Sequence, residues 1–179
     1  MRRNFLLVLI LSTCLSNLAT AQDCGGVDEK KDAFSGKTVK SARIFVGNLT
    51  TKWAVDLEQS EGATYMKWSI AVQGEYNQQL SVGTVLMLKL EDASIITLKT
   101  IEPTSPVTKA TGGGAGTVNI FTTYILKFSL SRDDLAAMAK SPISDFKIDV
   151  AGQMIKNPKI KDKQMKKIME ASACLFSTF

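Results

Sequence analysis

The sequence has 179 residues, a formal net charge of +5 and no histidine. Without an imidazole, Ser-His-Asp and Cys-His hydrolases and the usual catalytic zinc sites are excluded. The charge is small and spread along the chain, so the composition gives no electrostatic footprint for binding nucleic acid.

The first 21 residues have the pattern of a secretory leader. Two arginines precede an apolar run at residues 5–11, which is too short to span a bilayer, and the small-residue tripeptide Ala19-Thr20-Ala21 follows. We expect cleavage after Ala21 and export of a mature chain from Gln22 to the periplasm, the cell envelope or the medium. The alternative is lipidation at Cys14, although Thr13 is larger than the residue that such processing prefers.

Cleavage would remove two arginines and lower the net charge to +3. No other apolar run approaches the roughly 18 residues of a membrane-spanning helix, so we expect no transmembrane segment after cleavage. A chain of this length can bury a core without metals. We expect residues 22–36 to form an N-terminal extension and residues 37–179 a single β-rich domain without a cofactor.

Two cysteines remain in the mature chain, Cys24 near one end and Cys174 near the other. Disulfides persist in exported proteins, so we expect a bridge between them. The bridge would close nearly the whole chain into a loop, for which the chain-entropy model gives a stabilisation on the order of 5 kcal/mol. The alternative is two unpaired thiols, since a redox-active pair would need a C-x-x-C spacing.

Between Lys37 and Val150, apolar residues recur at every second position, which predicts β-strands. The alternating sets are Trp53, Val55 and Leu57; Met66, Trp68, Ile70 and Val72; Leu86, Leu88 and Leu90; Ile96 and Leu98; and Phe146, Ile148 and Val150. We expect each set, with both tryptophans, to face a core. The turn at 91–94 predicts a hairpin, and Gly47-Asn48 predicts another turn.

The longest alternating run, residues 118–130, is expected to be the central strand. Its predicted core face comprises Val118, Ile120, Tyr124, Leu126, Phe128 and Leu130. A strand with weaker alternation is expected at 38–46. Apolar residues on the opposite strand faces, which indicate strands partly covered on both sides, are Val85, Met87, Ile95 and Ile101. We predict a mainly β (α+β) fold with about seven strands in a mainly antiparallel sandwich or partly open barrel.

Two helices are predicted near the C-terminus. Ser131 can cap a short one, with Asp133 and Asp134 at the positive end of the helix dipole. The second is expected to begin at Asn157-Pro158 and to lie across the sheet. Its predicted buried arc comprises Met165, Ile168, Met169, Ser172, Leu175 and Phe176. Cys174 projects from the polar side, so the helix ends before it or the N-terminal segment passes along that flank.

Two segments are candidate binding surfaces. The stretch from Thr111 to Thr117 predicts a flexible loop that could close over a ligand. Its glycines are Gly112, Gly113, Gly114 and Gly116. It lacks the Gly-Lys-Ser/Thr of a phosphate-binding loop. The predicted C-terminal helix carries Lys163, Lys166 and Lys167, which form either an ordinary solvated face or a site for anionic lipid headgroups.

Carboxylates are the remaining route to catalysis, because two of them could perform acid–base chemistry on a glycan. The pairs close in sequence are Asp56 with Glu58, Glu91 with Asp92, and Asp133 with Asp134. We expect the first pair on a solvated strand face, the second in a turn and the third at a helix start. Each position has a structural explanation, so the sequence assigns no catalytic and no metal-binding residue.

Several layout features occur together: the leader that ends before Gln22, the segment Asp32-Ala33-Phe34-Ser35-Gly36-Lys37, the hairpin from Leu88 to Ser94, and the basic C-terminal helix. In this layout the chain resembles exported β-rich proteins of Gram-negative bacteria over most of the mature sequence. Ala93 stands where such hairpins more often have glycine. The resemblance implies no activity and no functional residues.

The expected function is therefore that of a non-enzymatic binding or structural module of the periplasm or cell envelope. Its partner would be an envelope protein or a surface ligand. The alternative is a histidine-independent hydrolase or lyase that uses carboxylates on a glycan.

Overall fold

The computed structural model describes residues 24, 26–46, 53–112, 118–150, 152–156 and 161–178. The predicted leader with Cys14, the turn at Gly47-Asn48 and the predicted helix start at Asn157-Pro158 lie outside these residues. The described part of the chain forms ten strands and two helices, a mainly β fold with two antiparallel sheets, as the alternation predicts.

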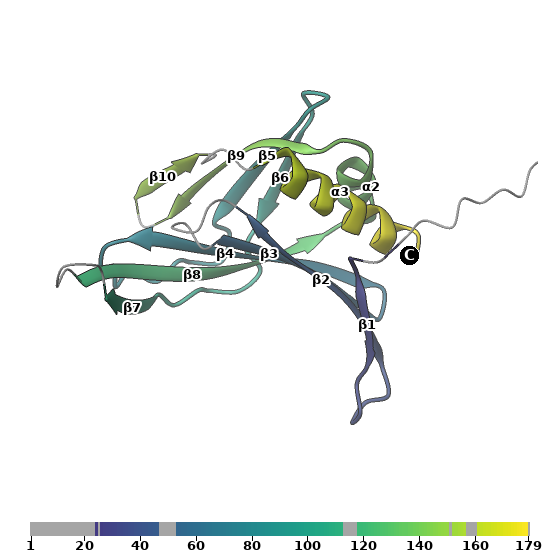
Figure 1. The fold of residues 1–179 in the computed structure, drawn as a ribbon, viewed down its shortest axis with the longest axis horizontal. Coiled ribbons are helices and arrows are strands. Elements are labelled where there is room, and N and C mark those ends of the chain that lie inside the picture. The colour runs from purple at the N-terminus through teal and green to yellow at the C-terminus, as the bar shows by residue number, and fades with distance from the viewer. Residues whose placement is uncertain are drawn as a thin grey trace, which may run out of the picture.

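Six strands form a sheet that curls into a half-barrel (Figure 1). In spatial order they are β1 (Asp28–Lys31), β2 (Thr38–Val46), β3 (Trp53–Ser60), β4 (Ala63–Gln73), β8 (Val118–Leu130) and β7 (Val107–Gly112). The second sheet holds β10 (Gln153–Lys156), β9 (Ile143–Val150), β5 (Val85–Leu90) and β6 (Ile95–Lys99). The two sheets meet where the chain after β6 pairs with β8 through Thr100 and Ile101.

The core lies between the two sheets and contains side chains from both. Trp68 is fully buried, and its ring centroid lies 4.7 Å from that of Phe146 on the opposite sheet. Trp53 meets the same phenyl ring edge-on at 5.5 Å. Both tryptophans are therefore core residues, as predicted. The predicted β5–β6 hairpin is also present, with Leu88 paired to Ile96.

Several details of the strands differ from the expectation. The described residues form ten strands, rather than about seven, because three short, mostly exposed ones, β1, β7 and β10, join the sheet edges. β8 is not central, since it stands fifth of six, and its first residues extend past the end of β4. Val118 and Ile120 are therefore exposed, although they share the face of Tyr124. Val85, Met87, Ile95 and Ile101 are exposed too, so their strand faces are not covered.

The short helix α2 (Arg132–Lys140) begins as predicted. Ser131 accepts a hydrogen bond from the Asp134 N–H, while the Asp134 carboxylate accepts one from the Ser131 N–H, which completes a capping box. The second helix, α3 (Asp162–Phe176), starts later than predicted. The Lys161 N–H donates to the Gln164 side chain there, and Asp162 complements the positive end of the dipole.

The apolar face of α3 packs against α2, β2, β3 and β9. The predicted arc from Met165 to Phe176 is buried or half-buried, as the helical periodicity requires. At the C-terminal end, Gln59 of β3 donates to the Leu175 carbonyl oxygen at 3.3 Å and accepts from the Thr178 hydroxyl at 2.6 Å. These contacts fix the end of α3 over the half-barrel.

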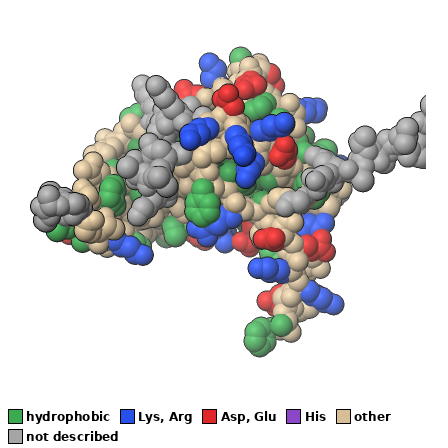
Figure 2. Space-filling model, in the orientation of Figure 1, with side chains coloured by type: hydrophobic (Ala, Val, Ile, Leu, Met, Phe, Trp, Pro, Cys, Tyr) green, Lys and Arg blue, Asp and Glu red, His purple; other side chains and the backbone are tan. Residues whose placement is uncertain are grey.

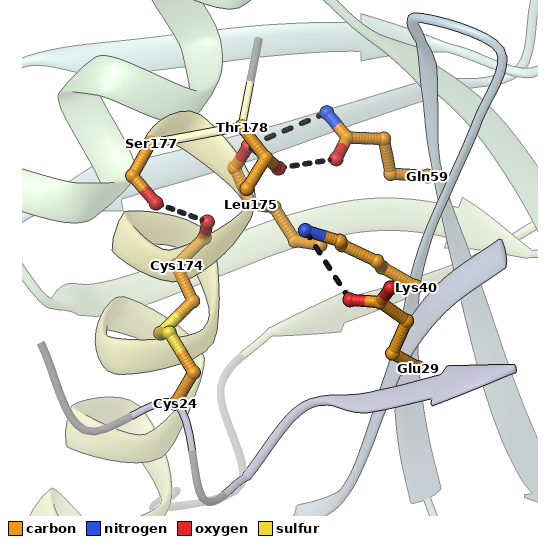
Figure 3. Close-up of a disulfide and its surroundings, with 8 residues drawn as sticks. All are labelled: Cys24, Glu29, Lys40, Gln59, Cys174, Leu175, Ser177 and Thr178. Carbon is orange, nitrogen blue, oxygen red and sulfur yellow. Dashed lines mark hydrogen bonds and ion pairs between the residues drawn. A yellow bond between two sulfur atoms is a disulfide. The ribbon is translucent and has the colours of Figure 1, made fainter. Parts of the chain in front are cut away.

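Cys24 and Cys174 form the predicted disulfide, with their Cα atoms 5.8 Å apart (Figure 3). The helix continues past Cys174, so the second of the two predicted arrangements is the correct one: the N-terminal segment passes along this flank. The bridge spans 150 residues of sequence. Residues 28–31, within the predicted N-terminal extension, then pair with β2, where Glu29 and Lys40 are 3.5 Å apart.

Candidate binding groove

The loop of residues 74–84 joins β4 to β5 and forms one wall of a groove. Gly74 opens the loop with a φ of +111°, and Gly83 near its end has a φ of +89°. Both values lie in the region that favours glycine. A Cβ on Gly74 would also stand 3.2 Å from the ring of Tyr76, which packs over it. The two glycines thus let the chain leave β4 and return into β5.

Buried hydroxyl groups hold the first half of this loop from inside the core. The Thr122 hydroxyl, fully buried on β8, donates to the Gly74 carbonyl oxygen at 2.8 Å and accepts from the Tyr76 N–H at 3.0 Å. Because the single Thr122 proton points at Gly74, the neighbouring Thr108 hydroxyl donates to Thr122 in their 3.0 Å contact. One threonine therefore fixes two backbone groups of the loop.

Tyr124, two residues further along β8, holds the middle of the loop. Its ring is fully buried, and its hydroxyl donates to the Gln78 carbonyl oxygen at 3.1 Å. Burial raises the pKa of Tyr124, and the nearby Tyr76 raises it further. The phenol therefore stays protonated and remains a hydrogen-bond donor near neutral pH.

The second half of the loop is tied to the chain that follows β6. The buried Thr100 hydroxyl donates to the Ser81 carbonyl oxygen at 3.1 Å and accepts from the Thr84 N–H at 3.0 Å. Leu80 and Thr104 exchange two backbone hydrogen bonds, each 2.9 Å long. The loop is consequently fixed near its beginning, middle and end, so its outward side chains stand on a rigid support.

The groove itself lies between this loop and the β9–β10 turn and has a volume of about 570 Å³. Its lining comprises Gln78, Gln79, Leu80, Ser81, Thr84 and Val85 on one side and Asp149 and Gly152 on the other. A hydrogen bond between the Gln153 amide and the Tyr76 hydroxyl joins the two sides. The groove therefore offers two amides, two hydroxyls and one carboxylate beside two apolar side chains.

This set of groups suits a ligand with many hydroxyls. Amides and hydroxyls each donate and accept hydrogen bonds, whereas a carboxylate only accepts. A sugar hydroxyl also donates and accepts, so it can be satisfied by either kind of group. Val85, which is exposed, can contact the apolar C–H face of a sugar ring. The lining can thus satisfy both the donors and the acceptors of a polar ligand.

The predicted glycine-rich loop lies elsewhere. Gly112 is the last residue of β7 and pairs with Val118, so the expectation of an irregular loop at Thr111 and Gly112 is wrong. Gly113, Gly114 and Gly116 lie outside the described residues. Ligand binding by this stretch stays a prediction.

The predicted lysine face is present on α3. Lys163, Lys166 and Lys167 are exposed, and Figure 2 shows basic side chains gathered over this helix. Lys167 lies with Glu170 and Arg43 around a pocket of about 270 Å³ beside the disulfide. This surface carries both signs of charge, and its contact with anionic lipid stays a prediction.

Most of the sequence-adjacent carboxylates have structural partners. Asp56 lies 3.4 Å from Arg43, and Glu58 lies 2.9 Å from Lys67, both on the outer face of the six-stranded sheet. Asp134 belongs to the helix cap. Asp92 accepts hydrogen bonds from the Ser94 hydroxyl at 2.6 Å and from the Ser94 N–H at 3.0 Å, which lower its pKa. Ala93 in this turn has a φ of +67°, a conformation that favours glycine.

None of the polar groups of the groove stands out in the sequence. One available signal was Tyr124, because a tyrosine predicted to face the core needs a partner for its hydroxyl. Comparisons of the chain with family models, with curated proteins and with solved structures find no match. Within the described ranges, no helix is long and apolar enough to cross a membrane, and no three Cys, Asp or Glu residues gather as a metal site would require.

Proposed function

We propose that the mature protein is a non-enzymatic binding module of the periplasm or cell envelope, and that it binds a cell-surface glycan in the groove beside the β4–β5 loop. The observation that carries the proposal is the support of this loop. Three hydroxyls buried in the core, those of Thr100, Thr122 and Tyr124, bond to loop carbonyl groups rather than to one another.

Such support favours binding for an energetic reason. Ordering a mobile loop on ligand binding costs conformational entropy, and this cost is avoided when the loop is already fixed. Sites with precise geometry are therefore held by groups behind the contacting side chains. The hydroxyls can take that role here, since each residue is buried and none of them is among the residues that line the groove.

The lining also favours binding over turnover. Hydrolysis of a glycosidic bond normally employs two carboxyl groups on opposite sides of the bond. Asp149 is the carboxylate among the residues that line the groove. A carboxylate with amides and hydroxyls can orient a glycan, while the alternative of a carboxylate-based hydrolase or lyase would use the pairs described above.

The experiment is a binding assay of the chain from Gln22 on a printed array of bacterial envelope glycans that includes murein fragments. We expect at least one glycan to be retained. Gln79→Ala removes one amide and should weaken that binding about fivefold, and Asp149→Asn should weaken it about tenfold or more, because hydrogen bonds to charged groups are stronger. Lys163→Ala on α3 is the matched control and should bind as the wild type does.

The binding and enzyme alternatives give different results on the retained glycan. The variants Asp56→Asn, Glu58→Gln, Asp133→Asn and Asp134→Asn should leave its binding unchanged, and mass spectrometry should find the glycan intact after incubation. Cleavage that disappears in one of these folded variants would overturn the non-enzymatic assignment. The assignment of the groove as the binding site would be overturned if the wild type retained no glycan above the level of the Gln79→Ala/Asp149→Asn double variant.

A further inference from the structure

The groove beside the β4–β5 loop differs in charge from two other pockets of the described structure. Its lining includes the carboxylate of Asp149 and, among the described residues, no lysine or arginine. Beside the disulfide, Glu170 is accompanied by Arg43 and Lys167, and in the pocket between the start of β9 and α3 two acids are accompanied by Lys166. The whole chain has a net charge of +5, so a groove without a cation does not follow from the composition.

The Asp149 carboxylate has no partner among the described residues. Asp149 is exposed on β9 and pairs with Met154 of β10 on one side. Val85 of β5 lies beside it on the other side, in the register of the β5–β9 ladder. Lys147, two residues earlier on the same face, is paired across the ladder with Met87. No ion pair or hydrogen bond within the described ranges engages the Asp149 carboxylate, so it is available to a ligand.

Two hydrogen-bond donors of the groove are already used within the protein. The Thr84 hydroxyl donates to the Ser81 carbonyl oxygen at 2.9 Å, so toward a ligand it can only accept. The Gln79 amide nitrogen donates to the Ser105 hydroxyl at 3.5 Å, which leaves the amide oxygen and one N–H for a ligand. The groups that remain are therefore richer in acceptors than the composition of the lining indicates.

Among the substituents that sugars carry, an ammonium group fits these acceptors most closely. It has three donors, no acceptor and a positive charge. A hydroxyl or an acetamide brings an acceptor with each donor, and a carboxylate or phosphate brings a negative charge that Asp149 repels. A hydrogen bond between an ammonium and a carboxylate is also about twice as strong as one between neutral groups.

We propose that the groove selects a glycan with free amino groups, and that Asp149 is the residue that determines this specificity. The ammonium of the sugar binds the Asp149 carboxylate, while Thr84 and Gln79 accept hydrogen bonds from the same sugar or its neighbour. This inference rests on the proposed glycan binding and adds the class of sugar.

The tetramers of cellulose, chitin and chitosan test the proposal, because they share one backbone and carry a hydroxyl, an acetamide or an amine at the same carbon. Calorimetric titration of the chain from Gln22 is performed at about pH 6, where an amine with a pKa near 8 is charged. We expect the chitosan tetramer to bind about tenfold more tightly than the other two. The preference should shrink between about 0.01 M and 1 M salt, since the Debye length falls from roughly 30 to 3 Å.

Two variants locate the preference. Asp149→Asn keeps the shape of the side chain and removes its charge, so it should bind the three tetramers with similar affinity. Glu75→Gln is the matched control, because it removes an exposed carboxylate of the same loop that does not line the groove, and it should keep the preference. Thermal melts equal to that of the wild type show that both variants are folded.

The outcomes separate this inference from the proposed function. Equal binding of the three tetramers by the wild type, or a preference that persists in Asp149→Asn, would overturn the inference and leave glycan binding in place. Absence of binding to the chitosan tetramer would also overturn it. In that case the groove remains the glycan site only if another glycan is retained on the array by the wild type and released by the Gln79→Ala/Asp149→Asn double variant.

Discussion

At the scale of single residues, hydroxyl groups in an apolar core determine the shape of the surface above them. Thr122 and Tyr124 are both fully buried on β8, and each would be costly there without a hydrogen-bond partner. Each finds that partner in a carbonyl group of the β4–β5 loop. The hydrogen bonds that these two hydroxyls require thus hold the loop, in addition to the loop's own backbone contacts.

Tyr124→Phe tests this support. The change removes the donor and leaves the Gln78 carbonyl group without its partner, which should cost about 1 kcal/mol of folding free energy. For a domain of this size we expect the melting temperature to fall by about 2–4 °C. Amide exchange in residues 76–80 should also become faster. The control is Tyr65→Phe, whose ring lies under Lys127 on the outer sheet face and whose loss of a hydroxyl should change neither quantity.

Asp32 gives a second prediction at this scale. The Ser35 backbone N–H, the Ser35 hydroxyl and the Phe34 N–H all stabilise its charged form and lower its pKa below the ordinary value of 3.8. The turn is therefore stabilised above pH 3.8, and this contribution is lost as the pH falls through the lower folded-state pKa. Carbon NMR titration should give a midpoint below 3.8 in the wild type and one closer to 3.8 in Ser35→Ala. A wild-type midpoint at or above 3.8 would contradict the turn geometry.

At the scale of elements, the position of α3 depends on a covalent tie as well as on packing. The Cys24–Cys174 bridge attaches the start of the described chain to the last turns of the helix. Gln59 and Thr178 hold the same end of α3 by hydrogen bonds. The helix therefore has its strongest attachments at its C-terminal end.

Reduction of the bridge should lower stability without changing the strand pairing. The chain-entropy model gives a loss of about 5 kcal/mol for a loop of this length. Urea unfolding monitored by circular dichroism, with and without reductant, measures the difference. The double variant Cys24→Ser/Cys174→Ser should match the reduced wild type and should not respond to reductant. An unchanged urea midpoint on reduction would show that packing alone holds α3.

The alternation of apolar and polar residues along the sequence predicted the strands that bury one face. β3, β4 and β5 were located from their sequences because every second side chain lies in the core. The sequence pattern did not predict β1, β7 and β10, because their side chains are mostly exposed and show no two-residue alternation of buried and exposed positions. They form because neighbouring strands offer a free edge, and such an edge is a property of the assembled sheet rather than of the local sequence.

The groove could not be predicted for a similar reason. Gln78 and Gln79 have the composition of an ordinary loop, and Asp149 alternates with core residues on β9. The loop that carries Gln78 and Gln79 is held by the Thr122 and Tyr124 hydroxyls, each 46 residues in sequence from the loop residue it contacts, Tyr76 or Gln78. The disulfide was predictable because only two cysteines remain after the expected cleavage.

At the scale of the whole molecule, the groove lies far from the first hairpin. Figure 1 shows β10, which borders the groove, and the β1–β2 hairpin, which projects as an arm, at opposite ends of the structure. The exposed Phe34 at the turn of this arm therefore leaves the groove accessible.

The central claim is that the groove beside the β4–β5 loop is the ligand site. The most direct test is NMR titration of the isotopically labelled chain from Gln22 with a glycan retained on the array. We expect the largest amide shift changes in residues 78–84 and at Asp149 and Gly152, and no saturating change in Asp149→Asn at the same concentrations. Shift changes confined to α3 or to the arm, with residues 78–84 unaffected, would contradict the account.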